Sequence, residues 1–166
     1  MSHSATLASL ETRLRALSDV EAIETLKSRY WRALDRKKSS EVESCLLATA
    51  IVDFEGLPRY ESRDAFMALV REAAKNPHVY NMHHGQNPQI TITGADSAEG
   101  TWDIFFYGID LSANSLLQMA GAYNDTYIRE HGTWLIAKSE MRISSLHVQT
   151  TQPRLRTVTL GRAATN

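Results

Sequence analysis

The sequence predicts an α+β fold, in which N-terminal helices pack on a curved, mixed, mainly antiparallel sheet. Up to about residue 75 most apolar residues recur at helical spacing, and from Pro77 onward the pattern changes to long strands. Such a sheet with helices on one face makes a cone-shaped barrel, and the space between the two layers is an apolar pocket. With 166 residues we expect a single domain over 1–166, with a helical part (5–75), a sheet (78–145) and an extended tail (146–166).

The chain begins with two predicted helices. Residues 5–17 carry leucines at helical spacing, and the sequence Ser18–Glu21 is typical of a capping box, which predicts that a second helix starts at about Ser18. That helix should run to about Lys37. Its apolar stripe follows the core face of an amphipathic helix and consists of Ile23, Leu26, Tyr30, Ala33 and Leu34.

A short helix and a short strand should follow. Ser40–Glu43 is a second capping-box pattern and predicts a helix that ends near Leu47. Ile51–Phe54 is typical of a strand, and Tyr60 belongs to a possible return strand after a turn.

The next predicted helix spans 63–74, with Ser62 as its N-cap and Phe66, Leu69 and Val70 on its apolar face. Strand patterns then continue without another helix. The predicted strands are Val79–His84, Gln89–Thr93, Ala98–Ile109, Ser115–Arg129 and Trp134–Ser144.

Composition excludes several classes of function. The formal net charge is -1, which argues against a nucleic-acid or anionic-membrane partner, and the apolar runs are far too short for a membrane span. Met1–Ala5 has no signal-peptide pattern, and Cys45 is the one cysteine, so no intramolecular disulfide forms. We therefore expect a cytoplasmic protein.

No motif points to a cofactor. The sequence contains no P-loop, no G-x-G-x-x-G, no G-x-S-x-G and no histidine spacing typical of zinc, so we expect neither cofactor nor metal. His83 and His84 are adjacent in a strand and therefore point to opposite faces. Asn81 shares the face of His83, but alternation alone does not decide which face meets the pocket.

Two charged residues each allow two interpretations. Asp35 ends a helix among cations, where a carboxylate opposes the helix dipole. It is either a surface acid paired with Arg32 or Lys38, or it turns inward to hold a histidine. Arg142 lies near the end of the last strand, where it either extends to water or meets an anionic group inside the barrel.

Apolar residues of the long strands are candidates for the pocket wall. If they face the space between the layers, they contact substrate; otherwise they fill an ordinary core. These apolar candidates are Trp102, Ile104, Phe106, Met119 and Tyr123. Asn81, on the neighbouring strand, is a polar candidate for the same wall.

In order and spacing, four segments resemble the SnoaL-like family of the nuclear transport factor 2-like superfamily. They are Tyr30–Asp35, Met82-His83, Tyr123–Tyr127 and Met141–Ile143, and the match runs from about residue 7 to about residue 145. The pattern is similar to the bile-acid 7α-dehydratases of this family, and less so to the scytalone dehydratases and hexachlorocyclohexane dehydrochlorinases. The chain departs from the bile-acid pattern at Phe106, where that pattern has an aspartate.

The resemblance implies cofactor-independent proton chemistry on a hydrophobic, often cyclic, small molecule. By position, Asp35 and His83 match the family's dyad with His83 as general base, Tyr30 matches a pocket hydroxyl and Arg142 matches the dehydratase arginine. We expect a lyase of the dehydratase type. The alternatives are an isomerase or polyketide cyclase with the same base, or a non-catalytic ligand-binding domain or oxygenase small subunit. The resemblance also implies a homo-oligomer, with a trimer ahead of a dimer.

Overall fold

The computed structural model describes residues 3–150, which form three helices and five strands. In chain order these elements are α1 (His3–Asp35), α2 (Ser39–Glu43), β1 (Leu46–Phe54), α3 (Arg63–Ala74), β2 (Val79–Ile92), β3 (Ser97–Asp110), β4 (Ser115–Glu130) and β5 (Thr133–Thr150). The predicted tail begins inside β5, and residues 151–166 lie outside the described part of the chain.

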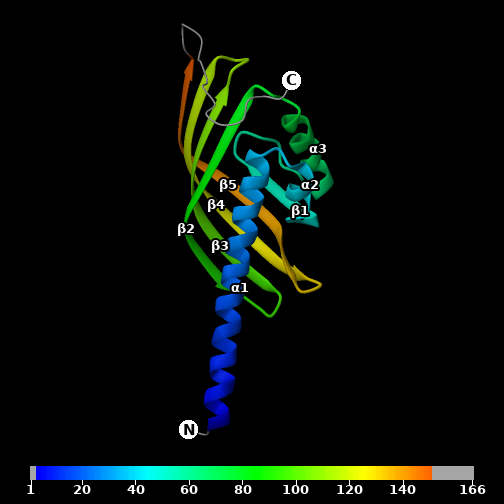
Figure 1. Ribbon diagram of the computed structural model, residues 1–166, viewed down its shortest axis with the longest axis vertical. Coiled ribbons are helices and arrows are strands. Elements are labelled where there is room, and N and C mark those ends of the chain that lie inside the picture. Colours follow the sequence, from blue (N-terminus) through cyan, green and yellow to red (C-terminus); the bar gives the residue numbers. More distant parts are fainter. Residues whose placement is uncertain (1–2, 151–166) are drawn as a thin grey trace, which may run out of the picture.

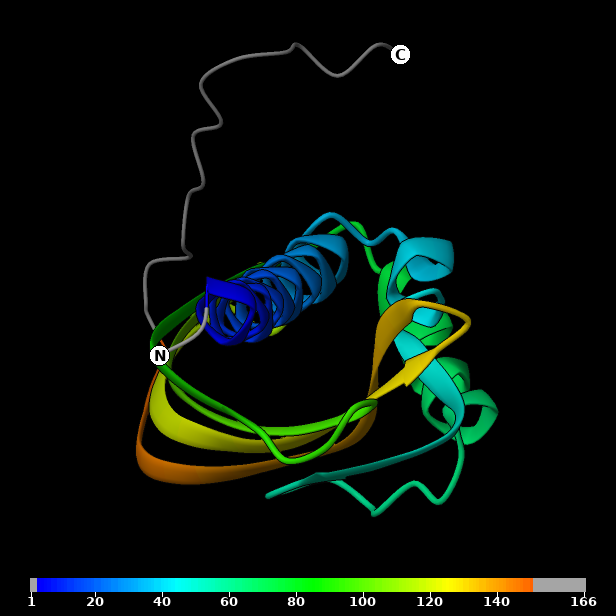
Figure 2. The ribbon, with the colours of Figure 1, turned by 90° about the horizontal axis from the view of Figure 1, so that it is seen from below.

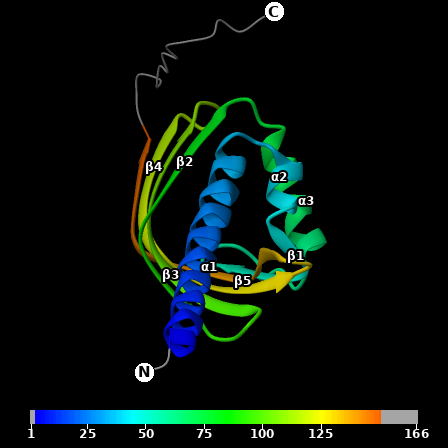
Figure 3. The same ribbon diagram turned by 60° about the horizontal axis from the view of Figure 1, so that its bottom comes forward.

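The strands form one sheet in the order β1-β5-β4-β3-β2. β1 runs parallel to β5, and the other neighbouring pairs are antiparallel. The sheet curves around α1, which lies on its concave side, while α2 and α3 lie beside β1 (Figures 1, 2 and 3). The predicted α+β class with a mixed, mainly antiparallel sheet is confirmed.

The helix α1 is continuous over 33 residues, so the predicted break at Ser18 is wrong. A capping-box sequence contains no residue that prevents a helix from continuing through it, and the side chain of Asp19 has tertiary partners instead. Its carboxylate accepts two hydrogen bonds from the Arg129 guanidinium, both at 2.8 Å, and one from the Trp134 indole at 3.1 Å. These bonds fasten the middle of α1 to the sheet.

The N-terminal turns of α1 extend beyond the sheet (Figure 1). Four leucines on these turns are half to two-thirds exposed, namely Leu7 (50%), Leu10 (53%), Leu14 (66%) and Leu17 (69%). The helical spacing of these leucines was predicted correctly, but they do not enter the core of the single chain.

The second predicted capping box is also wrong. The N-cap of α2 is Lys38, which makes no side-chain capping bond, and α2 is only five residues long. The chain leaves the helix at Ser44 because Leu46 already pairs with Ile136 of β5, which starts β1 five residues before the predicted strand. The predicted return strand at Tyr60 is a single antiparallel bridge to Val52.

The helix α3 has the predicted bounds and the predicted N-cap. The Ser62 hydroxyl accepts the backbone N–H of Ala65 at 3.3 Å, and the helix buries Phe66, Met67 and Val70. Packing of α3 across the end of β1, with the Phe54 and Phe66 rings 5.9 Å apart, closes one side of the molecule.

The two strands predicted before residue 94 are one strand, β2, with an irregularity between Gln86 and Gln89. Asn87 adopts a φ of 49° there, a conformation that asparagine tolerates better than most residues. The bulge keeps β2 paired with β3 along its whole length, and the pairing places His83 opposite Phe106.

Candidate active site

Asp35, the last residue of α1, and His83 of β2 are in direct contact. The Asp35 Oδ1 atom lies 2.6 Å from Nδ1 of His83, and Oδ2 accepts the backbone N–H of His83 at 3.0 Å. Both side chains are mostly buried, at 13% exposure for His83 and 19% for Asp35. The surface alternative for Asp35 fails, because Lys38 pairs with Glu41 instead.

This contact determines the protonation pattern of the imidazole. A carboxylate only accepts hydrogen bonds, so Nδ1 of His83 carries a proton, and in the neutral imidazole the lone pair is then on Nε2. The His83 ring also meets the edge of the Phe106 ring, with 4.7 Å between centroids. An oriented imidazole with a free Nε2 is the arrangement that general-base chemistry needs.

A cavity of about 380 Å³ lies beside the pair, between the end of α1, the helix α3 and the strands β2 and β3. Its walls are mainly apolar, and Asp35 and His83 form part of them. The apolar lining residues are Ala33, Leu34, Phe54, Leu57, Phe66, Leu69, Val70, Ala73, Ala74, Val79 and Phe106. The remaining polar ones are Lys37, Asn76 and Asn81. Volume and walls suit a small hydrophobic ligand.

A smaller cavity of about 230 Å³ lies on the other side of the pair and is more polar, with Ser28, Arg32 and His84 among its lining residues. Trp31 and Gly85 also line it. A side chain at Gly85 is impossible in this packing, since a Cβ there would lie 1.9 Å from the Trp31 ring. Glycine at this position therefore lets the indole rest on the β2 backbone two residues from His83.

Asn81 and Phe106 thus line the larger cavity as predicted from the sequence, but four other candidate residues do not. Trp102, Ile104 and Tyr123 are buried and Met119 packs against the same core, as the ordinary-core alternative expected. The reason is that α1 fills this part of the concave face. The Trp31 ring lies 5.3 Å from that of Trp102 and 5.7 Å from that of Tyr123, centroid to centroid.

Tyr30 lies in the core and does not line the cavity. Its side chain is fully buried, its hydroxyl has no hydrogen-bond partner among the described residues, and burial raises its pKa well above the ordinary value. The expectation that this phenol reaches the pocket is therefore corrected. One turn of helix separates it from Leu34, which does line the cavity.

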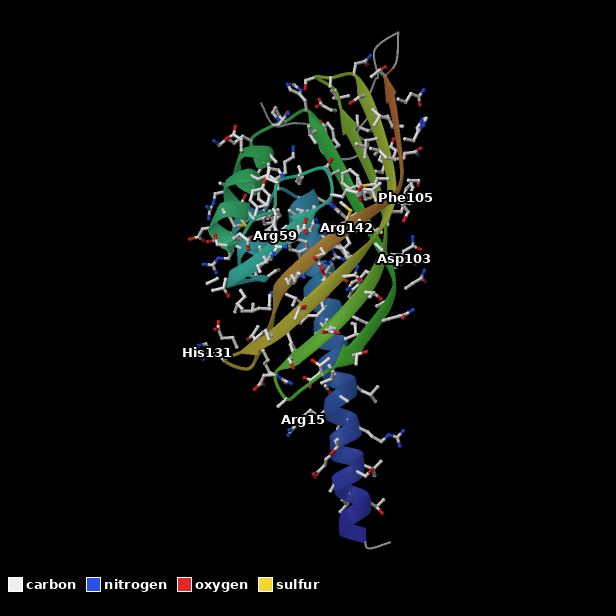
Figure 4. All side chains as sticks on the ribbon, turned by 180° about the vertical axis from the view of Figure 1, so that it is seen from behind. Arg15, Arg59, Asp103, Phe105, His131 and Arg142 are labelled. Atoms are coloured by element: carbon white, nitrogen blue, oxygen red, sulfur yellow. The ribbon has the colours of Figure 1, made fainter. Side chains whose placement is uncertain are left out.

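Arg142 also lies away from the cavity. Strand alternation turns it outward between Met141 and Ile143, and its guanidinium donates to Oδ2 of Asp53 at 2.8 Å and to the Asp53 carbonyl at 3.0 Å. Half of the side chain is exposed, on the face that also carries Arg59 (Figure 4). This pairing lowers the pKa of Asp53 and raises that of Arg142.

The structure contains a buried ion pair that sequence reasoning missed. The Lys27 ammonium lies 2.6 Å from Oδ2 of Asp125, and both side chains have no exposed surface. Asp125 also accepts hydrogen bonds from the Tyr127 hydroxyl and the Ser139 hydroxyl, both at 2.7 Å. Burial lowers the pKa of Lys27, and the charge of Asp125 opposes that shift.

Aromatic rings surround the ammonium of this pair. Lys27 Nζ lies 4.0 Å from the ring centroid of Tyr123 and 4.9 Å from that of Trp31. Two sequence signals point to the pair in hindsight. Lys27 stands on the apolar stripe of its helix, and Asp125 shares the inward strand face of Tyr123 and Tyr127.

Within residues 3–150, no group of three or more His, Cys, Asp or Glu side chains is arranged to hold a metal ion. No helix in the same range is long and apolar enough to cross a membrane.

The family of SnoaL-like domains matches residues 15–140 of the chain. The structure is similar to that of a type 2 hexachlorocyclohexane dehydrochlorinase, with 20% identity and a TM-score of 0.75 over 92% of this chain and 99% of the other. The type 3 enzyme from Novosphingobium barchaimii has 22% identity and a TM-score of 0.76 over 88% and 99%. A protein assigned as a scytalone dehydratase from Novosphingobium aromaticivorans has 20% identity and a TM-score of 0.74 over 89% and 97%. At these identities the likeness shows a shared fold.

Proposed function

This chain belongs to the family of SnoaL-like domains, and from that premise we propose that it is a cofactor-independent lyase acting on a hydrophobic, cyclic small molecule. It removes water, or another leaving group, by an elimination of the dehydratase type. The observation that carries the proposal is the contact of Asp35 with His83 at the wall of an apolar cavity. Two of the structural neighbours, a dehydrochlorinase and a protein assigned as a dehydratase, support the same reaction class.

In the proposed reaction, Nε2 of His83 takes a proton from a substrate carbon. The electron pair of the broken C–H bond forms the new C=C bond as the bond to the leaving group breaks. Asp35 stabilises the imidazolium that results, and the apolar wall strengthens this interaction by excluding water. For a dehydration, the imidazolium then gives its proton to the departing hydroxide, which leaves as water and restores the neutral histidine.

The proposal assigns no step to Tyr30 or Arg142, because neither side chain lines the cavity. That leaves His83 as both base and acid. The same observation favours a second candidate, an isomerase or cyclase, since returning the proton to another carbon requires no separate acid for a leaving group. The products separate the two, because an isomerase conserves the mass of its substrate.

Assembly is a further part of the proposal. We expect a homo-oligomer, with a trimer ahead of a dimer. Its support is the leucine stripe on the protruding turns of α1, whose spacing of three, four and three residues is that of a coiled-coil seam. Exposed apolar stripes of this length normally have a partner.

The test begins with ligand identification. Native mass spectrometry of the purified protein, followed by denaturation, identifies a co-purified small molecule. Cyclic alcohols, halides and ketones related to it are then incubated with the enzyme in heavy water, and mass spectrometry detects loss of the leaving group or uptake of deuterium. His83→Ala should slow both by roughly a hundredfold or more, whereas His131→Ala, in the hairpin between β4 and β5 (Figure 4), should change neither. Full turnover by His83→Ala would overturn the proposal and favour a binding domain.

A further inference from the structure

Lys37 places a positive charge at the end of the apolar cavity. Of the residues that line this cavity in the described part of the chain, it is the one lysine or arginine. The proposed elimination does not use it. An ammonium that lines a mainly apolar cavity calls for a partner of opposite charge.

The backbone of Lys37 adopts a conformation that favours glycine. Its φ is 56°, in the left-handed region, two residues after the end of α1. The backbone N–H of Lys37 bonds to the carbonyl of Leu34 at 3.0 Å, and that of Lys38 bonds to the carbonyl of Ala33 at 2.9 Å. This is a Schellman motif, in which glycine avoids the steric cost that other residues bear. The turn therefore needs no lysine, so the reason for this side chain lies elsewhere.

The Lys37 ammonium has spare donors. It donates to the backbone carbonyl of Asn76, at the end of α3, and an ammonium has three N–H groups. Within residues 3–150 it forms no ion pair, whereas its neighbour Lys38 pairs with Glu41 at 2.8 Å. The side-chain oxygen of Asn76 already accepts the backbone N–H of His78, so its amide N–H groups remain as donors on the same wall.

Asp35 lines the same cavity, but within residues 3–150 its carboxylate forms no ion pair with Lys37. Its two oxygens accept hydrogen bonds from the ring and the backbone of His83 instead. Asn76 lies three residues before Val79, the first residue of β2, and Val79 and Asn81 line the cavity between Asn76 and His83. Lys37 and His83 therefore lie at different points of the same cavity.

We propose that Lys37 and Asn76 form an anion subsite, and that the substrate is a small, largely apolar acid whose single carboxylate binds there while its reacting carbon lies at His83. A carboxylate suits the site better than a phosphate dianion, because Lys37 is the one lysine or arginine that lines this cavity in the described part of the chain, and a second negative charge would have no partner there. The inference rests on the proposed function in taking this cavity as the substrate site.

The test compares two ligands that differ in charge and hardly in shape, naphthalene-2-carboxylate and naphthalene-2-carboxamide. Isothermal titration calorimetry at low ionic strength measures both affinities for the full chain. The wild-type protein should bind the acid about tenfold more tightly than the amide, and added salt should reduce that preference. Because no turnover is measured, the outcome is independent of whether His83 acts as a base.

Three variants locate the charge. Lys37→Met keeps a side chain of similar length and should remove the preference for the acid, because it should weaken binding of the acid far more than binding of the amide. Lys37→Arg should keep the preference, and Lys38→Met, which removes the adjacent exposed cation, should match the wild type. The amide affinity reports whether each variant retains an intact cavity. An equal affinity of the wild-type protein for both ligands, or an acid preference that persists in Lys37→Met, would overturn the proposal.

Discussion

Asp35 holds both the ring and the backbone of His83, with one carboxylate oxygen on Nδ1 and the other on the backbone N–H. The two bonds join the end of α1 to β2 and determine the direction of the imidazole together with its tautomer. An imidazole held in this way pays little orientational entropy when it reacts.

The first prediction concerns this pair. His83→Ala should lower the turnover of an identified substrate by roughly a hundredfold or more, the usual scale for a general base. Asp35→Asn should be nearly as damaging, because an amide presents donors as well as acceptors and permits the wrong tautomer. Loss in the double variant should be far from additive, since the two residues act as a unit. Steady-state kinetics measures all three.

His84→Ala is the neighbouring control for these variants. Asp35 bonds to His83 and not to His84, and His84 does not line the larger cavity, so its loss should have a mild effect on turnover. A loss comparable to that of His83→Ala would contradict the assignment of the base.

The second prediction concerns the wall opposite the imidazole. Phe106→Asp should weaken binding of a neutral hydrophobic ligand at least about tenfold and destabilise the protein by about 2 kcal/mol, because the new carboxylate has no cationic partner beside His83. Phe105→Asp is the matched control, since Phe105 is 39% exposed on the outer face of β3 (Figure 4). Calorimetry and urea unfolding distinguish the two variants. Equal effects would mean that the strand faces are assigned wrongly.

The third prediction concerns Lys27 and Asp125. Lys27→Met should destabilise the protein by about 3 kcal/mol or more, since it leaves a buried carboxylate without its countercharge. Lys38→Met, which removes an exposed pair, should cost less than about 1 kcal/mol. Urea unfolding measures both. A double-mutant cycle with Asp125→Asn should give a coupling energy well above that of the exposed pair, and additive effects would contradict a direct interaction.

The fourth prediction is a pH dependence. Burial opposes ionisation of Asp19, but the hydrogen bonds from Arg129 and Trp134 outweigh it and lower its pKa below the ordinary value of 3.8. The stabilisation is therefore fully present above that value and is lost as the pH falls through the lowered pKa. Below about pH 4 the free energy of unfolding should fall more steeply for the wild-type protein than for Asp19→Asn. Parallel curves from chemical unfolding would contradict this.

The fifth prediction concerns assembly. Multi-angle light scattering at micromolar concentration should show a homo-oligomer, with the mass of a trimer ahead of that of a dimer. Leu10→Lys combined with Leu14→Lys should shift the mass toward the monomer, because two charges then interrupt the leucine stripe. A wild-type protein that is monomeric would contradict the prediction.

Local patterns predicted the elements well where a periodic run ends at a clear signal. Ser62 and the helix after it are an example, since the capping bond is made within four residues. The capping-box sequence at Ser18–Glu21 wrongly predicted the start of a helix. The Asp19 side chain within it bonds to Arg129, 110 residues away, and does not cap a helix terminus. Two local interpretations of such a sequence exist, and only distant contacts decide between them.

The candidate site was predictable to the extent that family order and spacing carried it. Asp35 and His83 meet as expected, and Phe106 follows from its register opposite His83. The burial of Lys27 was not predicted, because hydropathy places a lysine on the surface. Its partner Asp125, 98 positions later, makes it part of the core. The direction of the Arg142 side chain was not predictable from alternation, because the pairing of β4 with β5 shifts its register close to this residue.

The single long helix α1 also has two different local stabilities along its length. At 1.5 Å per residue its 33 residues extend about 50 Å. From Asp19 onward it is bonded to the sheet, whereas the turns before it expose their leucines, and an isolated helical segment of that length is marginal in water. In the single chain, amide hydrogens of the first turns should exchange with solvent through local fraying of the helix. Those around Ile23 and Leu26 should exchange only when the whole protein unfolds. Oligomer formation would then appear as slower exchange confined to the N-terminal turns.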